Sequence, residues 1–136
     1  MTAAPVPASA GFDLADARFV ELTTFRRTGA AVPTPVWVAG DGDALVVLTP
    51  TDSGKVARIR HTPRVALRAC GRTGAVADDV RPVDGVARIV TDPTEARRLT
   101  DLVRRRYGLE YRVVMAVERL AARRRKPRVV LRITTG

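Results

Sequence analysis

The residues best suited to hold an anion stand together in the segment Thr49 to Lys55 and the turn of chain that follows it. An apolar run ends there, a polar turn follows, and a short helix is expected to begin at Ser53-Gly54-Lys55. The first N–H groups of a helix are unpaired and carry the positive end of its dipole, so they attract anions. Hydroxyl, ammonium and guanidinium groups that could bind phosphate oxygens come in the order Thr49, Thr51, Ser53, Lys55 and Arg58.

This pattern predicts a phosphate-binding turn, with an ordinary capped helix and a solvated lysine as the alternative. It is not a nucleotide-binding P-loop, because Gly54 is the only glycine between Thr49 and the lysine, and the glycine-rich spacing of that motif is absent. Other chemistry is poorly supplied. The chain has one cysteine, Cys70, and one histidine, His61, so an internal disulfide and a multi-cysteine metal site are excluded. No protein nucleophile and no acid–base pair stands out, and we assign neither catalytic residues nor metal ligands.

Charge is unevenly distributed along the chain, whose formal net charge is +10. Residues 1–96 hold 11 basic and 11 acidic residues, whereas residues 97–136 hold 13 basic and three acidic ones. Such asymmetry suggests an anionic partner near the C-terminal third, or else a basic solvated helix face. Nucleic acid is a weak candidate for that partner, because aromatic residues make up only 4% of the chain and no base-stacking or recognition-helix motif is present.

The chain has 136 residues, of which 46% are apolar, and this suits one packed domain. We expect a flexible N-terminal arm over residues 1–11 and one domain over residues 12–136. The arm is rich in alanine and proline but lacks the charged and apolar regions of a secretion signal. No apolar run approaches the roughly 18 residues that a membrane span needs, so we expect a soluble, cytoplasmic protein.

Six stretches alternate in polarity or are rich in β-forming residues, and they predict strands at residues 19–25, 31–39, 44–49, 64–70, 80–90 and 128–134. Helices are expected at residues 12–20 and 53–61, and a third should start within residues 91–94 and run to about residue 107, with Gly108 as its stop. Residues 109–125 suggest a further helix or a helix–strand junction. Pro33 and Pro35 cannot donate to a strand ladder, so the second strand should lie at an edge or carry a bulge.

The short connections between these stretches favour antiparallel pairing, and small sheets avoid open edges by closing on themselves. The expected fold is therefore mainly β: a barrel of about six antiparallel strands with two or three peripheral helices.

Four segments resemble the pyridoxamine 5′-phosphate oxidase-like superfamily, the FMN-binding split barrels, and more closely its branch that uses the deazaflavin coenzyme F420. They are Leu22-Thr23-Thr24-Phe25-Arg26-Arg27-Thr28-Gly29, Val32-Pro33-Thr34-Pro35-Val36-Trp37, the run from Thr49 to Arg60 that contains Ser-Gly-Lys-Val-Ala-Arg-Ile, and the turn Thr62-Pro63-Arg64-Val65. The resemblance covers residues 19–90 well and the C-terminal helix and strand more loosely.

The resemblance implies a split β-barrel that binds a cofactor, in a homodimer whose second subunit completes each site. It places Thr34, Pro35 and Val36 along the isoalloxazine or deazaflavin ring, and Leu48 and Thr49 at the ring and ribityl chain. Ser53, Gly54 and Lys55 match the phosphate turn, with Arg58 one turn beyond. In the FMN-using oxidases the position of Gly54 is commonly arginine, so glycine there favours F420 over FMN.

The resemblance thus predicts an F420-dependent reductase that transfers a hydride between the cofactor and an unsaturated or heteroaromatic small molecule. An FMN-dependent oxidoreductase of the same fold is one alternative, and a non-catalytic protein that binds a deazaflavin or a haem-type ligand is another. Because F420 carries an acidic oligoglutamate tail, a basic surface could steer it. The candidates for that surface are Arg97, Arg98, Arg104, Arg105, Arg106 and the cluster from Arg123 to Arg128. Trp37, Tyr107 and Tyr111 are expected to be packing residues, and Cys70 a small buried one.

Overall fold

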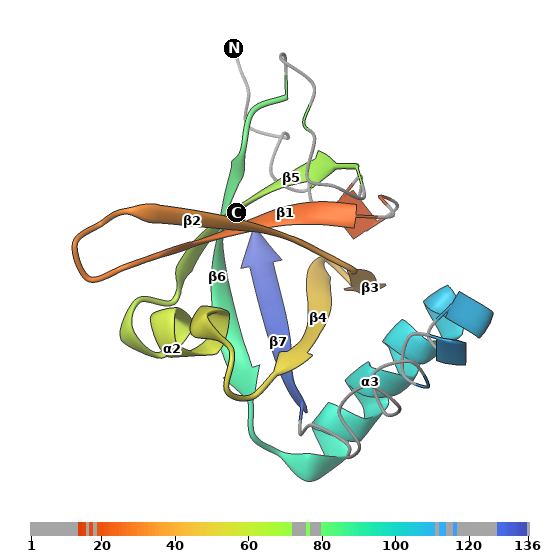
Figure 1. Ribbon diagram of the computed structural model, residues 1–136. Coiled ribbons are helices and arrows are strands. Elements are labelled where there is room, and N and C mark those ends of the chain that lie inside the picture. Colours follow the sequence, from red (N-terminus) through yellow and green to blue (C-terminus); the bar gives the residue numbers. More distant parts are fainter. Residues whose placement is uncertain are drawn as a thin grey trace.

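The computed structural model in Figure 1 describes residues 14, 15, 17, 19–71, 76, 80–110, 112, 113, 116 and 128–135. The arm expected at residues 1–11 lies outside this part, as do Tyr111 and most of the stretch 109–125. Leu14 and Ala15 are helical, whereas Phe19 already starts a strand. The helix predicted for residues 12–20 therefore extends too far toward the C-terminus.

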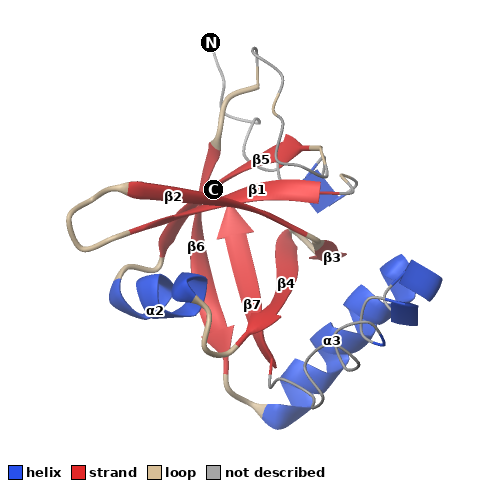
Figure 2. Cartoon of the chain, in the orientation of Figure 1, coloured by secondary structure: helices blue, strands red, loops and turns tan. Residues whose placement is uncertain are grey.

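Seven antiparallel strands form one sheet, in the order β2-β1-β5-β6-β7-β4-β3. Their bounds are β1 (Phe19–Phe25), β2 (Ala31–Val36), β3 (Ala39–Asp41), β4 (Ala44–Pro50), β5 (Arg64–Cys70), β6 (Val83–Val90) and β7 (Arg128–Thr135). Leu109, Glu110, Arg112, Val113 and Ala116 are helical too. Among the described residues, the two helices with defined bounds are α2 (Gly54–His61) and α3 (Pro93–Tyr107). As Figure 2 shows, they lie apart from each other at the lower end of the sheet.

The sheet curls into a barrel that is split between its two edge strands, β2 and β3. These edges are joined by only two residues, Trp37 and Val38. In a flat sheet, seven strands about 4.8 Å apart would place the edges about 29 Å from each other. Three steps along the chain span at most about 11 Å. The sheet must therefore bend until its edges meet, and the predicted mainly β barrel is confirmed.

One predicted strand is divided in the structure. Residues 31–39 were expected to form a single strand, but β2 pairs with β1 and β3 pairs with β4. The inside–outside alternation continues through the break, because Val36 and Val38 face the barrel interior while Trp37 and Ala39 face outward. The polarity pattern of a sequence does not show where a strand changes its pairing partner. The sequence therefore predicts six strands, whereas the described residues form seven.

The position of β2 at an edge confirms the prediction from its prolines. Pro33 pairs with Thr23 and Pro35 with Glu21, and β2 has no neighbour on its other side. A proline nitrogen has no hydrogen to donate, so it is tolerated only where it faces away from the ladder.

The barrel interior is a cluster of aliphatic side chains contributed by β1, β4, β5, β6 and β7. Ile59 of α2 belongs to the same cluster, so this helix covers part of the interior. Gly85 of β6 lies where a Cβ would come within 3.0 Å of the Thr134 carbonyl and 3.2 Å of Ile133 Cγ2. The interior is filled by Leu14, Val20, Leu22, Val38, Leu45, Val47, Ile59, Val65, Leu67, Ala87, Leu131 and Ile133.

A second apolar cluster lies outside the barrel, beneath α3. Leu99, Val103 and Tyr107 of α3 pack there against β3, β4, β6 and β7, which contribute Ala39, Val46, Val90 and Val130. The helix begins as predicted, with the Asp92 carboxylate accepting from the Glu95 N–H at 2.9 Å, and it ends at Gly108. In the part of the chain that is described, no helix is both long and apolar enough to cross a membrane.

Candidate phosphate and cofactor site

The predicted anion turn forms where β4 ends and α2 begins. Ser53 caps α2, as expected, and its Oγ accepts from the Val56 N–H at 3.4 Å. The Thr49 hydroxyl, which is almost fully buried, lies 3.3 Å from the Ser53 hydroxyl. Val56 and Ile59 anchor the helix in the core, so the turn is held by packing together with the Ser53 cap. The result is a fixed helix start with two hydroxyls beside it.

Lys55 and Arg58 supply positive charge at this helix start. Lys55 is half-buried, and its pKa lies below the ordinary lysine value, first because burial disfavours the charged amine and then because the Arg58 charge repels it. In the described residues, neither side chain forms an ion pair with a carboxylate; Asp52, in the same turn, is exposed. Two neighbouring cations without a counter-ion match a phosphate group.

Arg58 is held across Gly54. Its Nε donates to the Thr24 hydroxyl at 2.6 Å, and a Cβ placed on Gly54 would lie 2.7 Å from its Nη1. The guanidinium therefore fills the space that a side chain at position 54 would need. Thr24 is fully buried on β1 and was missed by the sequence analysis, because only the folded barrel brings it to a helix 34 residues further along the chain.

The residues expected at the cofactor ring lie on β2, which is a different element. Thr34 and Val36 are half-buried and Pro35 is exposed. Thr34 pairs with Leu22 of β1, two residues from Thr24. The Arg58–Thr24 hydrogen bond thus connects the phosphate turn, through β1, to the edge strand.

Leu48 is separated from the other predicted contacts by the pleat of β4. Its side chain packs with the outer cluster beneath α3, whereas Thr49 faces the opposite side of the sheet. Five predicted residues are therefore brought together at the turn: Thr49, Ser53, Gly54, Lys55 and Arg58. Thr34, Pro35 and Val36 form a second group on β2, and Leu48 joins neither group, because it pairs with Val130 of β7 and packs beneath α3.

Comparison with protein-family models shows which family the chain belongs to. The family model described as pyridoxamine 5′-phosphate oxidase matches residues 8–136. The chain belongs to this family. No curated protein matches the chain.

Solved structures share the fold of this family member at low sequence identity. A conserved hypothetical protein from Mycobacterium tuberculosis is 24% identical, with a TM-score of 0.66 over 99% of this chain and 81% of that one. An F420 reductase is 22% identical, with a TM-score of 0.59 over 91% of each chain. The haem storage protein HutZ from Vibrio cholerae is 12% identical, with a TM-score of 0.64 over 92% of this chain and 87% of that one.

Two other residues with reactive side chains, His61 and Cys70, are not among the groups brought together at the turn. His61 is exposed at the end of α2. Cys70 is half-buried rather than buried, and its thiol pKa is raised, first by burial and then by the Glu21 carboxylate. Among the described residues, no three histidine, cysteine or acidic side chains gather as metal ligands.

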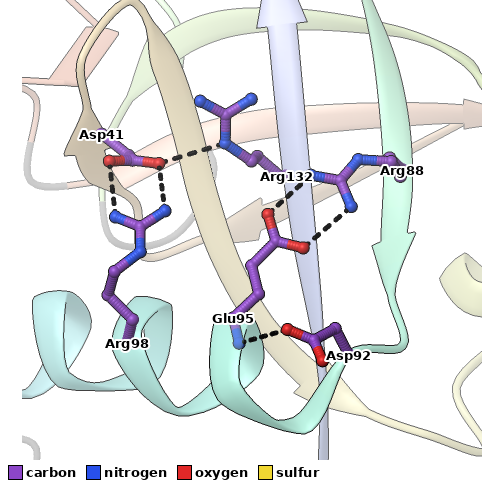
Figure 3. Close-up of polar contacts among 6 residues, drawn as sticks. All are labelled: Asp41, Arg88, Asp92, Glu95, Arg98 and Arg132. Carbon is purple, nitrogen blue, oxygen red and sulfur yellow. Dashed lines mark hydrogen bonds and ion pairs between the residues drawn. The ribbon is translucent and has the colours of Figure 1, made fainter.

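The arginines of α3 differ from those of α2 because several are already paired. Figure 3 shows Arg98 donating two hydrogen bonds to Asp41, at 3.0 and 3.2 Å, while Arg132 donates to the same carboxylate at 3.1 Å. In the same view Arg88 of β6 holds Glu95 at 2.8 and 3.1 Å. Arg104 lies 3.5 Å from Asp101, and Arg106 donates to the Ala17 carbonyl at 2.9 Å. Arg97 and Arg105 are exposed, and Arg123 to Lys126 lie outside the described residues.

Proposed function

We propose that this chain is an F420-dependent oxidoreductase that reduces an unsaturated or heteroaromatic small molecule. The observation that carries the proposal is the arrangement of Lys55 and Arg58 at the start of α2, with Arg58 lying across Gly54. The superfamily fold binds flavin-type cofactors, and this turn has the charge and hydroxyl groups to hold their phosphate.

Gly54 supports F420 over FMN within that class. In the FMN-using oxidases this position commonly bears an arginine, which would here collide with the Arg58 guanidinium. The chain instead brings one arginine to the turn from the next helical turn. The fold of the F420 reductase named above is compatible with this reading, although at 22% identity the similarity concerns the fold alone.

In the proposed complex, each group of residues has a separate task. Thr49, Ser53, Lys55 and Arg58 bind the phosphate, and backbone groups of Thr34 to Val36 orient the ring. The reduced cofactor supplies the hydride, so the protein needs no nucleophile of its own. We further propose a cytoplasmic homodimer in which the partner subunit completes each site.

Fluorescence titration of the purified protein with F420, and in parallel with FMN, tests the proposal. We expect F420 to bind at least tenfold more tightly than FMN, and reduced F420 to be consumed when a suitable acceptor is added. A yellow protein that carries FMN and ignores F420 would establish the first alternative.

The second alternative is a binding protein without turnover. It gains some support from the fold shared with a haem storage protein, although that similarity also concerns the fold alone at 12% identity. Tight binding of F420 or haem without reduction of any compound in a panel of electron acceptors would favour it. The panel should include quinones and nitroaromatic compounds, since both accept two electrons.

A further inference from the structure

Tyr107, the last residue of α3, makes two hydrogen bonds with a single residue of the barrel. Its hydroxyl donates to the Val38 carbonyl at 2.8 Å and accepts from the Val38 N–H at 3.0 Å. Both residues are buried, Val38 completely. One phenol group therefore pairs both the backbone donor and the backbone acceptor of the same residue, 69 residues earlier in the chain.

Val38 needs such a partner because of its place in the barrel. It lies in the two-residue crossover between β2 and β3, where the chain leaves one edge of the sheet and joins the other. Neither strand includes it. A buried N–H or C=O group without a partner is costly, so the Tyr107 hydroxyl takes the role that a neighbouring strand has elsewhere.

Two further contacts hold α3 near the crossover between β2 and β3. The rings of Trp37 and Tyr107 are stacked, with centroids 4.5 Å apart and an interplanar angle of 12°. The Arg98–Asp41 pair ties the middle of α3 to the end of β3. Figure 1 shows α3 running along this side of the barrel, with β3 above it.

We propose that Tyr107 is a positioning residue for the cofactor ring. By fixing Val38, it fixes the chain two residues after Val36, and so the end of the edge strand whose residues Thr34 to Val36 are proposed to orient the ring. This inference rests on the proposed function. The phosphate turn at α2 is anchored separately, through Ser53, Val56 and Thr24, so Tyr107 acts on the ring end of the site and leaves the phosphate end alone.

The test compares two probes, F420 and the deazaflavin chromophore without its phosphate, each titrated by fluorescence against the full chain. Tyr107→Phe keeps the stacked ring and removes the hydroxyl. We expect it to raise the Kd of both probes about five- to tenfold, the effect of losing well-placed hydrogen bonds. Lys55→Ala should raise the Kd of F420 alone, because the second probe has no phosphate.

Val103→Ala is the matched control. Val103 is buried on the same helix and belongs to the outer cluster, but its aliphatic side chain cannot hydrogen-bond the Val38 backbone, so its truncation destabilises α3 without removing the partner of Val38. We expect this variant to bind both probes like the wild type at a temperature where thermal unfolding shows every variant to be folded. Equal weakening by Val103→Ala and Tyr107→Phe would overturn the positioning role.

The other results also decide the matter. Unchanged Kd values in Tyr107→Phe, with normal binding by the wild type, would refute the inference and leave the proposed function standing. Binding of neither F420 nor FMN by the wild type would refute both. If Tyr107→Phe does not fold, Arg98→Gln loosens α3 at the surface, and the phosphate-free probe should then bind about two- to threefold more weakly; an unchanged Kd there would also overturn the inference.

Discussion

The two helices use their basic residues in opposite ways. At α2, Lys55 and Arg58 stand beside each other without a carboxylate partner among the described residues; burial lowers the pKa of Lys55, and the Arg58 charge lowers it further. At α3, Arg98 is bound to Asp41, and Glu95 accepts from Arg88. Yet α2 lies within residues 1–96, which carry no net charge. Most of α3 lies within residues 97–136, which carry the entire excess of positive charge.

The difference teaches that a surplus of charge in the sequence does not locate an anion site. Opposite charges that meet in the fold cancel, and Arg98 uses its charge to attach α3 to β3 through Asp41. Like charges left together at α2 are unfavourable without a ligand, and such a local cost is typical of binding sites. The comparison can be tested by changing each helix in turn.

The largest effect is expected from Lys55→Ala. We expect F420 binding to weaken by about 1–3 kcal/mol, the scale of a charge-assisted hydrogen bond, while the free energy of unfolding stays the same or rises slightly because repulsion by Arg58 is relieved. In the wild type, the lowered pKa of Lys55 means that affinity falls as the pH rises through it, earlier than for an ordinary lysine. Fluorescence titration over a pH series measures both; unchanged affinity in the variant would leave α2 an ordinary capped helix.

Gly54→Ala should show whether Arg58 depends on the missing side chain. The added Cβ displaces the guanidinium, and we expect F420 binding to weaken by about 1–2 kcal/mol, as for loss of one charged hydrogen bond. Stability should not fall, because alanine favours a helix more than glycine does. The effect should vanish in an Arg58→Ala background, and a double-mutant cycle measures this. Additive losses would show that the two residues act independently.

Asp41→Asn tests the paired charges of α3. The Asp41 carboxylate is 17% exposed, and its pKa is lowered, chiefly by the hydrogen bonds from Arg98, with Arg132 contributing after the opposing effect of burial. A lowered folded pKa gives stability that is present above the ordinary value of about 3.9 and is lost as the pH falls through the folded value. We expect the variant to lose about 1 kcal/mol of unfolding free energy at pH 7, with the two curves converging in acid. Urea unfolding at a series of pH values measures this, with Asp43→Asn, at an exposed position near Asp41 in the chain, as the matched control variant.

The smallest effect is expected from reversing the charges of Arg104, Arg105 and Arg106. If these residues steer the acidic tail of F420, reversal should weaken F420 binding about two- to threefold at low salt and have no effect at high salt. FMN, which has no such tail, serves as the control ligand. Unchanged F420 affinity at low salt would remove any role of this surface in binding.

Local features of the chain were predictable because their causes are local. Ser53 and Asp92 cap helices by hydrogen bonds to N–H groups three residues ahead, and Gly29 and Gly42 occupy the positive φ values that their turns require. Pro33 and Pro35 marked an edge because proline lacks a donor. The anion turn itself was visible, since its groups lie within ten residues of one another.

What only the tertiary structure decided depends on contacts between distant segments. The polarity pattern continues through Trp37 and Val38, and only the pairing partner changes, from β1 before the break to β4 after it. The bond from Arg58 to Thr24 spans 34 residues, and that from Tyr107 to Val38 spans 69. The sequence by itself determined that the hydroxyl and cationic groups of residues 49–58 stand close to one another; the closing of the sheet determined what holds Arg58 and the edge strand in place, because hydrogen bonds across a barrel follow from its curvature rather than from the order of residues.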